Sequence, residues 1–282
     1  MMLIADSGST KTDWRFIDEF NNIHHTQSVG LNPYFTSEAE MVEALTTGPI
    51  KLFSPGEIQQ IHFYGAGCSS EAQITKVEQA LQQVYPQAEI LVEHDLLGAA
   101  RALCGRQKGI SAILGTGSNS CMYDGEFIVK NIASLGYVLG DEGSGGYIGK
   151  LFLADALRGD IPEKLAKKFE EKFKLTREKA LENVYMQPFP NRFLASFTRF
   201  LYQNMEFQYT KDLIANSFRA FFEKQVMQYE GHENMPVNFV GSIAFNFSVI
   251  LREVAEEKNM EVGQILQAPI AALTLYHINE NA

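Results

Sequence analysis

The sequence has few cysteines, few basic residues and no long apolar run, and each shortage excludes a class of protein. Its three cysteines, Cys68, Cys104 and Cys121, form no C-x-x-C pair, which indicates reduced thiols rather than a disulfide framework or a zinc site. Only 24 basic residues face 34 acidic ones, and the net charge of -10 opposes binding to nucleic acid. No apolar run approaches the roughly 20 residues that span a bilayer, and no leader pattern opens the chain. We therefore expect a cytoplasmic protein without nucleic-acid or membrane partners.

Length and composition favour two compact domains. The chain has 282 residues, of which 45% are hydrophobic, so it can bury a large core and fits two domains better than one. The best boundary is the polar, glycine-flanked stretch "CGRQKG" at 104–109, between an expected helix and an expected strand. We predict a first domain over 1–107, with a C-terminal helix at 268–282 that packs back on it. The second domain is predicted over 108–267, with a helical insertion at about 150–232.

Strand and helix signals alternate along the chain. Ser37 and Glu40 have the spacing of a capping box, which predicts a helix through about Leu45. Ser70 is expected to cap a longer helix through Val84. Because strands that alternate with helices are typical of an α/β fold, we predict that class. Strands are expected at 3–6, 13–17, 61–64, 89–93, 111–114 and 237–240.

A glycine turn rich in hydroxyl groups opens each expected domain. The stretches "IADSGSTKTDW" at 4–14 and "AILGTGSNSCMYDG" at 112–125 both consist of a strand, a turn and a second strand, with Gly117 in the position of Gly8. One such turn is usually an ordinary hairpin. Backbone N–H groups at tight glycine turns also bind anions, however, so a pair of turns suits a polyphosphate. Neither turn is a P-loop or a dinucleotide fingerprint, since neither motif occurs in the sequence.

Six short motifs occur in the order found in a known superfamily and span nearly the whole chain. They are "DSGSTKTD" at 6–13, "GLNPY" at 30–34, "EHDLLGAA" at 93–100, "LGTGSNS" at 114–120, "GDEGSGGYIG" at 140–149 and "VGSIA" at 240–244. With them the sequence resembles the sugar kinase, Hsp70 and actin superfamily, and within it the N-acetylglucosamine kinases and the BadF/BadG/BcrA/BcrD ATPases. The resemblance implies two ribonuclease-H-like domains, as in actin-like ATPases, with a nucleotide in the cleft between them.

The resemblance also implies a site for ATP and Mg²⁺. Asp6 would be the Mg²⁺ ligand, since Mg²⁺ commonly takes one or two carboxylates together with waters and phosphate oxygens. Taken alone, an aspartate at a strand end is equally well explained as a turn residue, and Lys11 alone as a solvated surface lysine. The implied ATP-binding residues are Gly8, Ser9, Thr10, Lys11, Gly115, Thr116, Gly117, Gly241 and Ser242.

Asp95 is the implied catalytic residue. It follows an expected strand and begins an expected helix, so the residue alone is best explained as an N-cap. In the kinases that the chain resembles, the matching aspartate accepts the proton of the attacking sugar hydroxyl, a role that needs one carboxylate near the nucleophile. We expect His94 to be structural and its side chain to point elsewhere, because side chains alternate in direction along a strand.

Amide and carboxylate groups suit the recognition of a polyhydroxylated ligand. The alternative roles are a turn residue for Asn32, which precedes Pro33, and a helix N-cap for Asp141. Leu135 and Tyr137 stand where N-acetylglucosamine kinases of the mammalian type carry Trp and His, which leaves the particular sugar open. The substrate-binding residues implied by the resemblance are Asn32, Asp95, Ser118, Asn119 and Asp141.

The resemblance implies an ATP-dependent kinase that phosphorylates an amino sugar. The sugar would be N-acetylglucosamine or a relative such as glucosamine or N-acetylmuramic acid, with the 6-hydroxyl as acceptor. The expected partners are this sugar and ATP, and a homodimer is left open. An ATPase that activates an electron-transfer enzyme is an alternative, but it needs cysteines for a bridging iron–sulfur cluster, an arrangement that these three do not suggest. A non-catalytic sensor of sugar or nucleotide is the other alternative, and it would bind without turnover.

Overall fold

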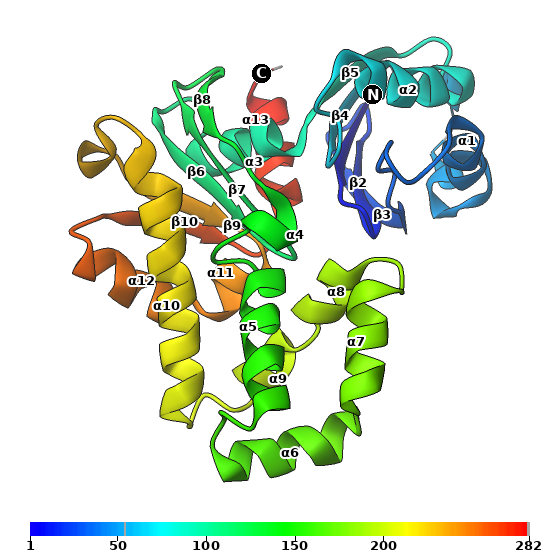
Figure 1. Cartoon of the computed structure of the whole chain (residues 1–282). Helices are drawn as coiled ribbons and strands as arrows, with labels where there is room; N and C mark the ends of the chain where they lie inside the picture. The colour runs from blue at the N-terminus through cyan, green and yellow to red at the C-terminus, as the bar shows by residue number, and fades with distance from the viewer. Residues whose placement is uncertain (54, 281–282) are drawn as a thin grey trace. The chain divides into compact units, whose positions relative to one another are not determined.

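The computed structural model describes residues 1–53 and 55–280, and the chain divides into two compact units (Figure 1). Unit 1 comprises Met1–Arg106 together with the segment that begins at Pro269, and unit 2 comprises Gln107–Ala268. Each unit contains one five-stranded mixed sheet with helices around it. The predicted α/β class is therefore confirmed.

The two sheets repeat one topology. In each sheet, the first strand forms an antiparallel hairpin with the second strand, and the second pairs antiparallel with the third. On its other side, the first strand lies parallel to the fourth. The fifth strand is parallel to the fourth. The strands of unit 1 are β1 (Met2–Ser7), β2 (Lys11–Ile17), β3 (Ile23–Val29), β4 (Gln60–Gly65) and β5 (Glu89–His94). Those of unit 2 are β6 (Gly109–Leu114), β7 (Ser118–Tyr123), β8 (Ile128–Ile132), β9 (Val237–Val240) and β10 (Val262–Leu266).

The helices of unit 1 lie against its sheet, whereas most helices of unit 2 form one long stretch between β8 and β9. Unit 1 has α1 (Glu38–Thr47), α2 (Glu71–Val84), α3 (Asp95–Cys104) and α13 (Ile270–Glu280). Unit 2 has α4 (Gly136–Leu139), α5 (Gly145–Arg158), α6 (Glu163–Phe173), α7 (Arg177–Tyr185), α8 (Pro190–Ala195), α9 (Thr198–Tyr202), α10 (Gln208–Lys224), α11 (Ser242–Asn246) and α12 (Ser248–Glu257). Within residues 1–53 and 55–280, no helix has the length and apolar character that crossing a membrane requires.

Helix starts show which local signals were decisive. At α1 the capping box forms as predicted: Ser37 Oγ accepts from the N–H of Glu40, and the Glu40 carboxylate accepts from the N–H of Ser37. Helix α2 begins after Ser70 and ends at Val84 as predicted, but the Ser70 side chain makes no capping bond, so that part of the prediction is wrong. The N–H of Gln73, which such a cap would bind, donates to the Ser70 carbonyl instead.

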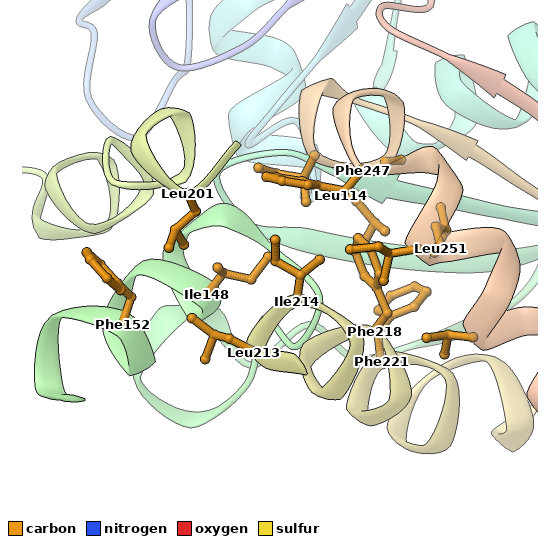
Figure 2. Packing of buried hydrophobic residues seen from close by; sticks show 14 of the residues in the cluster. Leu114, Ile148, Phe152, Leu201, Leu213, Ile214, Phe218, Phe221, Phe247 and Leu251 are labelled. Carbon is orange, nitrogen blue, oxygen red and sulfur yellow. The ribbon is translucent and has the colours of Figure 1, made fainter. Parts of the chain in front are cut away.

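The core of unit 2 lies between its sheet and helices α5, α10 and α12. Figure 2 shows side chains from these helices gathered beside Leu114, the last residue of β6. Leu114 is fully buried, and so it anchors the glycine turn that follows it in the chain. The residues labelled in this cluster are Leu114, Ile148, Phe152, Leu201, Leu213, Ile214, Phe218, Phe221, Phe247 and Leu251.

Helix α13 completes unit 1 from the other end of the chain. Its His277 is buried, and Nε2 of that ring lies 2.8 Å from the hydroxyl of Tyr64, which also accepts a hydrogen bond of 2.8 Å from Arg101 of α3. The His277 ring stacks on His62 of β4 at 3.9 Å between centroids. Burial, with the neighbouring His62 and arginines, lowers the pKa of His277 to about 3, so this ring is neutral at physiological pH.

Candidate active site

The glycine turn of unit 1 joins β1 to β2 and is stabilised by backbone hydrogen bonds, one of them from Gly30. The N–H of Gly8 donates to the carbonyl of Lys11 over 2.9 Å, and the N–H of Gly30 donates to the carbonyl of Thr10 over 3.1 Å. Gly30 lies so close to the turn that a Cβ atom there would be 2.3 Å from the carbonyl oxygen of Gly8. The turn therefore has one fixed shape, and its exposed residues are Ser9, Thr10 and Lys11.

Asn32 lies beside this turn. Its buried side chain donates from Nδ2 to Ser9 Oγ over 2.8 Å, and its Oδ1 accepts from the N–H of Tyr34 over 3.0 Å. A Cβ atom at Gly67 would be 2.5 Å from Asn32 Oδ1, so a second loop approaches the amide closely. Asn32 is thus a turn residue whose amide is fixed next to the glycine turn.

Three aspartates interact electrostatically at the end of β1. Asp6 is the register partner of Asp13 on β2, and the Asp13 carboxylate pairs with Lys11 over 2.7 Å and accepts from Gln27 of β3. Burial, together with the negative charges of Asp95 and Asp13, raises the pKa of Asp6 to about 7, while Lys11 opposes this shift. Negative charge is therefore concentrated where β1 enters the glycine turn.

Asp6 suits a cation. A bound cation would relieve the repulsion that contributes to its raised pKa, and Mg²⁺ commonly takes only one or two carboxylates because it keeps several waters. Among the described residues, no group of three or more His, Cys, Asp or Glu side chains is arranged to hold a metal ion. The residues fit a Mg²⁺ that takes its remaining ligands from phosphate and water.

We predict that Asp6→Asn makes the unliganded protein more stable above pH 7. Because the pKa of Asp6 rises from 3.8 to about 7 on folding, the folded state holds the proton more tightly, and wild-type stability falls as pH rises between these values. Asparagine removes this loss, which is about 1 to 4 kcal/mol at alkaline pH. Urea unfolding at about pH 5 and about pH 8 measures it. Asp18→Asn is the control: hydrogen bonds to Asn22 lower the pKa of Asp18 to about 2, so this carboxylate does not titrate in the range tested. Parallel pH slopes in wild type and Asp6→Asn would contradict the prediction.

Asp95 is the first residue of α3, and His94 is its N-cap. The Nδ1 atom of His94 lies 3.0 Å from the backbone nitrogen of Leu96 and accepts from it, and it also lies 2.9 Å from Oδ1 of Asp95. The N-cap explanation of Asp95 is therefore wrong, and so is the expectation that the two side chains point apart. Strand alternation ends at His94, where the chain turns into the helix. Asp95 keeps 29% of its side chain exposed, so its carboxylate is accessible.

The glycine turn of unit 2 joins β6 to β7 and rests on the start of α5. The N–H of Gly115 donates to the carbonyl of Gly117 over 3.0 Å, which closes the turn. The N–H groups of Gly145 and Gly146 donate to the carbonyls of Gly115 and Thr116 over 2.8 and 2.9 Å. A Cβ atom at Gly146 would be 2.9 Å from the Thr116 carbonyl oxygen, so glycine permits this close approach. The Thr116 side chain is exposed above the turn.

Gly241 brings a second predicted loop to this turn. It follows β9, which is parallel to its neighbour β6, so the carboxyl ends of the two strands meet at one edge of the sheet. Gly241 has φ 121°, and a Cβ atom there would be 2.3 Å from the carbonyl oxygen of Leu114 and 3.2 Å from the nitrogen of Gly115. Its exposed neighbour Ser242 begins α11. The predicted ATP-binding residues of unit 2 therefore form one cluster.

Asp141 is buried beside the same turn in a left-handed conformation, with φ 58°. Its Oδ1 accepts from Ser134 Oγ over 3.0 Å, and its carboxylate accepts from the backbone N–H of Ser118. Burial raises the pKa of Asp141, although these two hydrogen bonds oppose the shift. The N-cap of α5 is Ser144, whose Oγ accepts from the N–H of Tyr147, so the alternative of Asp141 as the cap is wrong.

Two residues that contact predicted residues, Asn131 and Gln27, could not be found from the sequence. In unit 2, Asn131 of β8 donates from Nδ2 to Oδ1 of the predicted residue Asn119 over 2.9 Å. In unit 1, Gln27 of β3 donates to the Asp13 carboxylate of β2. Gln27 and Asn131 both lie on edge strands outside the two aligned stretches at 4–14 and 112–125, so no sequence motif marked them.

Solved structures of other proteins share the fold of this chain. No family model and no curated protein matches the chain. A candidate N-acetylglucosamine kinase from Chromobacterium violaceum is 15% identical, covers 98% of each chain and has a TM-score of 0.76. A ROK family glucokinase from Streptomyces griseus, in complex with glucose and AMPPNP, is 13% identical, covers 100% of this chain and 98% of its own, and has a TM-score of 0.56. These two structures share the fold, which agrees with two ribonuclease-H-like domains.

A third structure is much more similar in sequence. It is a candidate N-acetylglucosamine kinase from Porphyromonas gingivalis, 41% identical to this chain over 100% of both chains, with a TM-score of 0.95. Identity at this level over the full length confirms the family that the motifs indicated. The chain belongs to the N-acetylglucosamine kinase-like family of the sugar kinase, Hsp70 and actin superfamily.

Proposed function

We propose that the protein is an ATP-dependent kinase of an amino sugar, N-acetylglucosamine or a near relative, that phosphorylates the 6-hydroxyl. The observation that carries the proposal is that two carboxylates interact electrostatically. Asp95 has an accessible carboxylate, and Asp6, at the end of β1, has a carboxylate whose pKa is raised by burial and by nearby negative charge. A kinase needs these two functions side by side: a group that accepts the proton of the nucleophile, and a carboxylate for the cation that accompanies the phosphates.

In this proposal the glycine turns bind the phosphates of ATP. Backbone N–H groups and small hydroxyl side chains at such turns make several hydrogen bonds to phosphate oxygens without steric cost. The exposure of Ser9, Thr10 and Thr116 supports this role, as does the cluster that Gly241 forms with the second turn. Asp6 would hold Mg²⁺, which when bound neutralises charge on the phosphates. The ATP-binding set is Gly8, Ser9, Thr10, Lys11, Gly115, Thr116, Gly117, Gly241 and Ser242.

Asp95 is the proposed general base. As the sugar oxygen attacks the γ-phosphorus and the bond to ADP breaks, the hydroxyl proton passes to the Asp95 carboxylate. The carboxylate is partly exposed and lies in the first turn of α3, directly after β5. A sugar hydroxyl can therefore reach the Asp95 carboxylate.

Asn32, Ser118, Asn119 and Asp141 are the proposed sugar-binding residues. Asp141→Asn should raise the KM of the sugar about 10-fold or more and change that of ATP little, since a lost charged hydrogen bond is felt mainly by its own ligand. Asparagine tolerates the left-handed conformation of residue 141, so the fold should persist. Ser134→Ala is the matched control, because it removes a donor to Asp141 but keeps the carboxylate. Equal increases in both KM values would contradict this assignment.

A coupled ADP-release assay over a panel of sugars tests the proposed function. The panel contains N-acetylglucosamine, glucosamine, N-acetylmuramic acid and glucose, and phosphorus–proton correlation NMR of the product locates the phosphate. Rapid turnover of an amino sugar with phosphate on the 6-hydroxyl is the expected result. Sugar binding without turnover would favour a sensor, and ADP release that no sugar accelerates would favour an ATPase.

A further inference from the structure

We propose that His94 is a positioning residue for Asp95. The Nδ1 atom of His94 switches between two partners, the backbone N–H of Leu96 and the carboxylate of Asp95. The neutral ring caps α3 and leaves the Asp95 carboxylate free, whereas the protonated ring binds that carboxylate. The inference rests on the proposed function, in which Asp95 accepts the proton of the sugar.

One atom of His94 makes two contacts that require opposite protonation states. Nδ1 lies 3.0 Å from the backbone nitrogen of Leu96, and accepting from that N–H requires a lone pair on Nδ1. The same Nδ1 lies 2.9 Å from Oδ1 of Asp95, and donating to that carboxylate requires a proton on Nδ1. A single nitrogen in the ring plane satisfies one of these requirements at a time.

Each state has a structural consequence. With a lone pair on Nδ1, the cap bond to Leu96 forms, and the lone pair repels Oδ1 of Asp95, so the carboxylate turns toward its substrate. With a proton on Nδ1, the ring holds Asp95 in an ion pair, and the N–H of Leu96 loses its capping partner. The protonated state therefore weakens the base by occupying it.

The charged groups around His94 raise the pKa of its ring. Burial lowers the pKa of His94, but the hydrogen bond that the protonated ring donates to Asp95 and the negative charges of Asp95 and Glu93 outweigh it, so the pKa lies above the usual 6.5. From β4 the register partner of His94 is the uncharged Gly65. Cys68 also lies near Asp95, but burial and that charge raise the pKa of its thiol to about 12, which keeps it neutral.

Stability and activity then respond to pH in opposite directions. Because folding raises the pKa of His94, its pairing with Asp95 stabilises the fold below the unfolded pKa, and this contribution is lost as pH rises through the folded pKa. Over the same range the carboxylate is released, so kcat should rise. A histidine that served only as a helix cap would make the fold more stable, not less, as its ring lost the proton.

His94→Asn separates the two roles. Asparagine is a good N-cap and supplies an oxygen for the Leu96 N–H, but it does not take up a proton in this range. Asp6 titrates near pH 7 in both proteins, so the informative quantity is the ratio of kcat in the variant to kcat in wild type. We expect this ratio to be about tenfold higher at about pH 6 than at about pH 8.5, with a melting temperature close to that of wild type. A ratio that is constant with pH would overturn the inference.

NMR of the wild-type ring gives a test that needs neither turnover nor a folded His94 variant. The ¹⁵N shift of His94 Nδ1 should change from that of a lone-pair nitrogen to that of an N–H as pH falls. Asp95→Asn should lower the pKa of His94, since the acceptor charge is gone. An Nδ1 that keeps one state through this range, or a pKa that Asp95→Asn leaves unchanged, would overturn the inference. If wild type phosphorylates no sugar but the ring titrates as expected, the proposed function fails and the coupling of His94 to Asp95 stands.

Discussion

Asp95→Asn will lower kcat for sugar phosphorylation by about 10²- to 10⁴-fold while both substrates still bind. The amide has the size of the carboxylate but cannot accept the hydroxyl proton, so the loss falls on the chemical step rather than on binding. The N-cap of α3 should persist, because His94 rather than Asp95 supplies it. Steady-state kinetics, calorimetry with each ligand and a melting curve measure these three quantities.

Asp13→Asn is the matched control for this experiment. Asp13 is a second carboxylate that interacts with Asp6, but it is nearly buried and held by Lys11 and Gln27. Its loss should therefore leave most of kcat, whereas both variants should lower the pKa of Asp6 by removing a negative charge. Near-normal kcat in Asp95→Asn, or an equal loss in both variants, would show that Asp95 is not the base.

Gly30→Ala will weaken ATP binding by about 10-fold or more and lower the free energy of unfolding by about 1 to 3 kcal/mol. An added Cβ atom would be 2.3 Å from the carbonyl oxygen of Gly8 and 2.5 Å from the carbonyl carbon of Ser9. These are backbone atoms, so no side chain can rotate away and the turn itself must shift. Titration calorimetry with ATP and urea unfolding measure the two effects.

Gly56→Ala is the control for the glycine substitution. It is an exposed glycine of unit 1 at which a Cβ atom would meet nothing within 4 Å, so stability and ATP affinity should both stay near wild type. If Gly30→Ala also bound ATP normally, the turn of unit 1 would not be a phosphate site, whatever happened to stability.

Burial explains much of which strands could be predicted from the sequence. β1, β4 and β9 are largely buried and read as short apolar runs, and all three were predicted within two residues at each end. The edge strands β3, β8 and β10 were missed, whereas β5, also at an edge, was predicted at 89–93. In β3, the sequence "IHHTQSV" is mostly exposed, and in β10 a glycine interrupts the run, so neither shows the pattern of a buried strand.

The site divides along a similar line. The two glycine turns and the aspartates at strand ends could be found from the sequence, because they stand in short contiguous motifs. The approach of Gly30 to Gly8 and the bond of Asn131 to Asn119 join residues that are distant in sequence or lie on strands that no motif marked. The prediction that the side chains of His94 and Asp95 point apart was wrong for a different reason. The alternation rule for strands was applied to Asp95, which already belongs to helix α3.

Unit 1 is discontinuous in sequence, whereas unit 2 is one uninterrupted segment. During synthesis the chain leaves the ribosome from its N-terminus, so the sheet of unit 1 emerges first but lacks α13 until the whole of unit 2 has been made. Until then His277 is not there to bond Tyr64, and the face that α13 covers is open to solvent. Unit 1, whose synthesis begins first, is therefore the unit whose folding is completed last. Its incomplete form is the stage at which chaperones or premature aggregation would act on this chain.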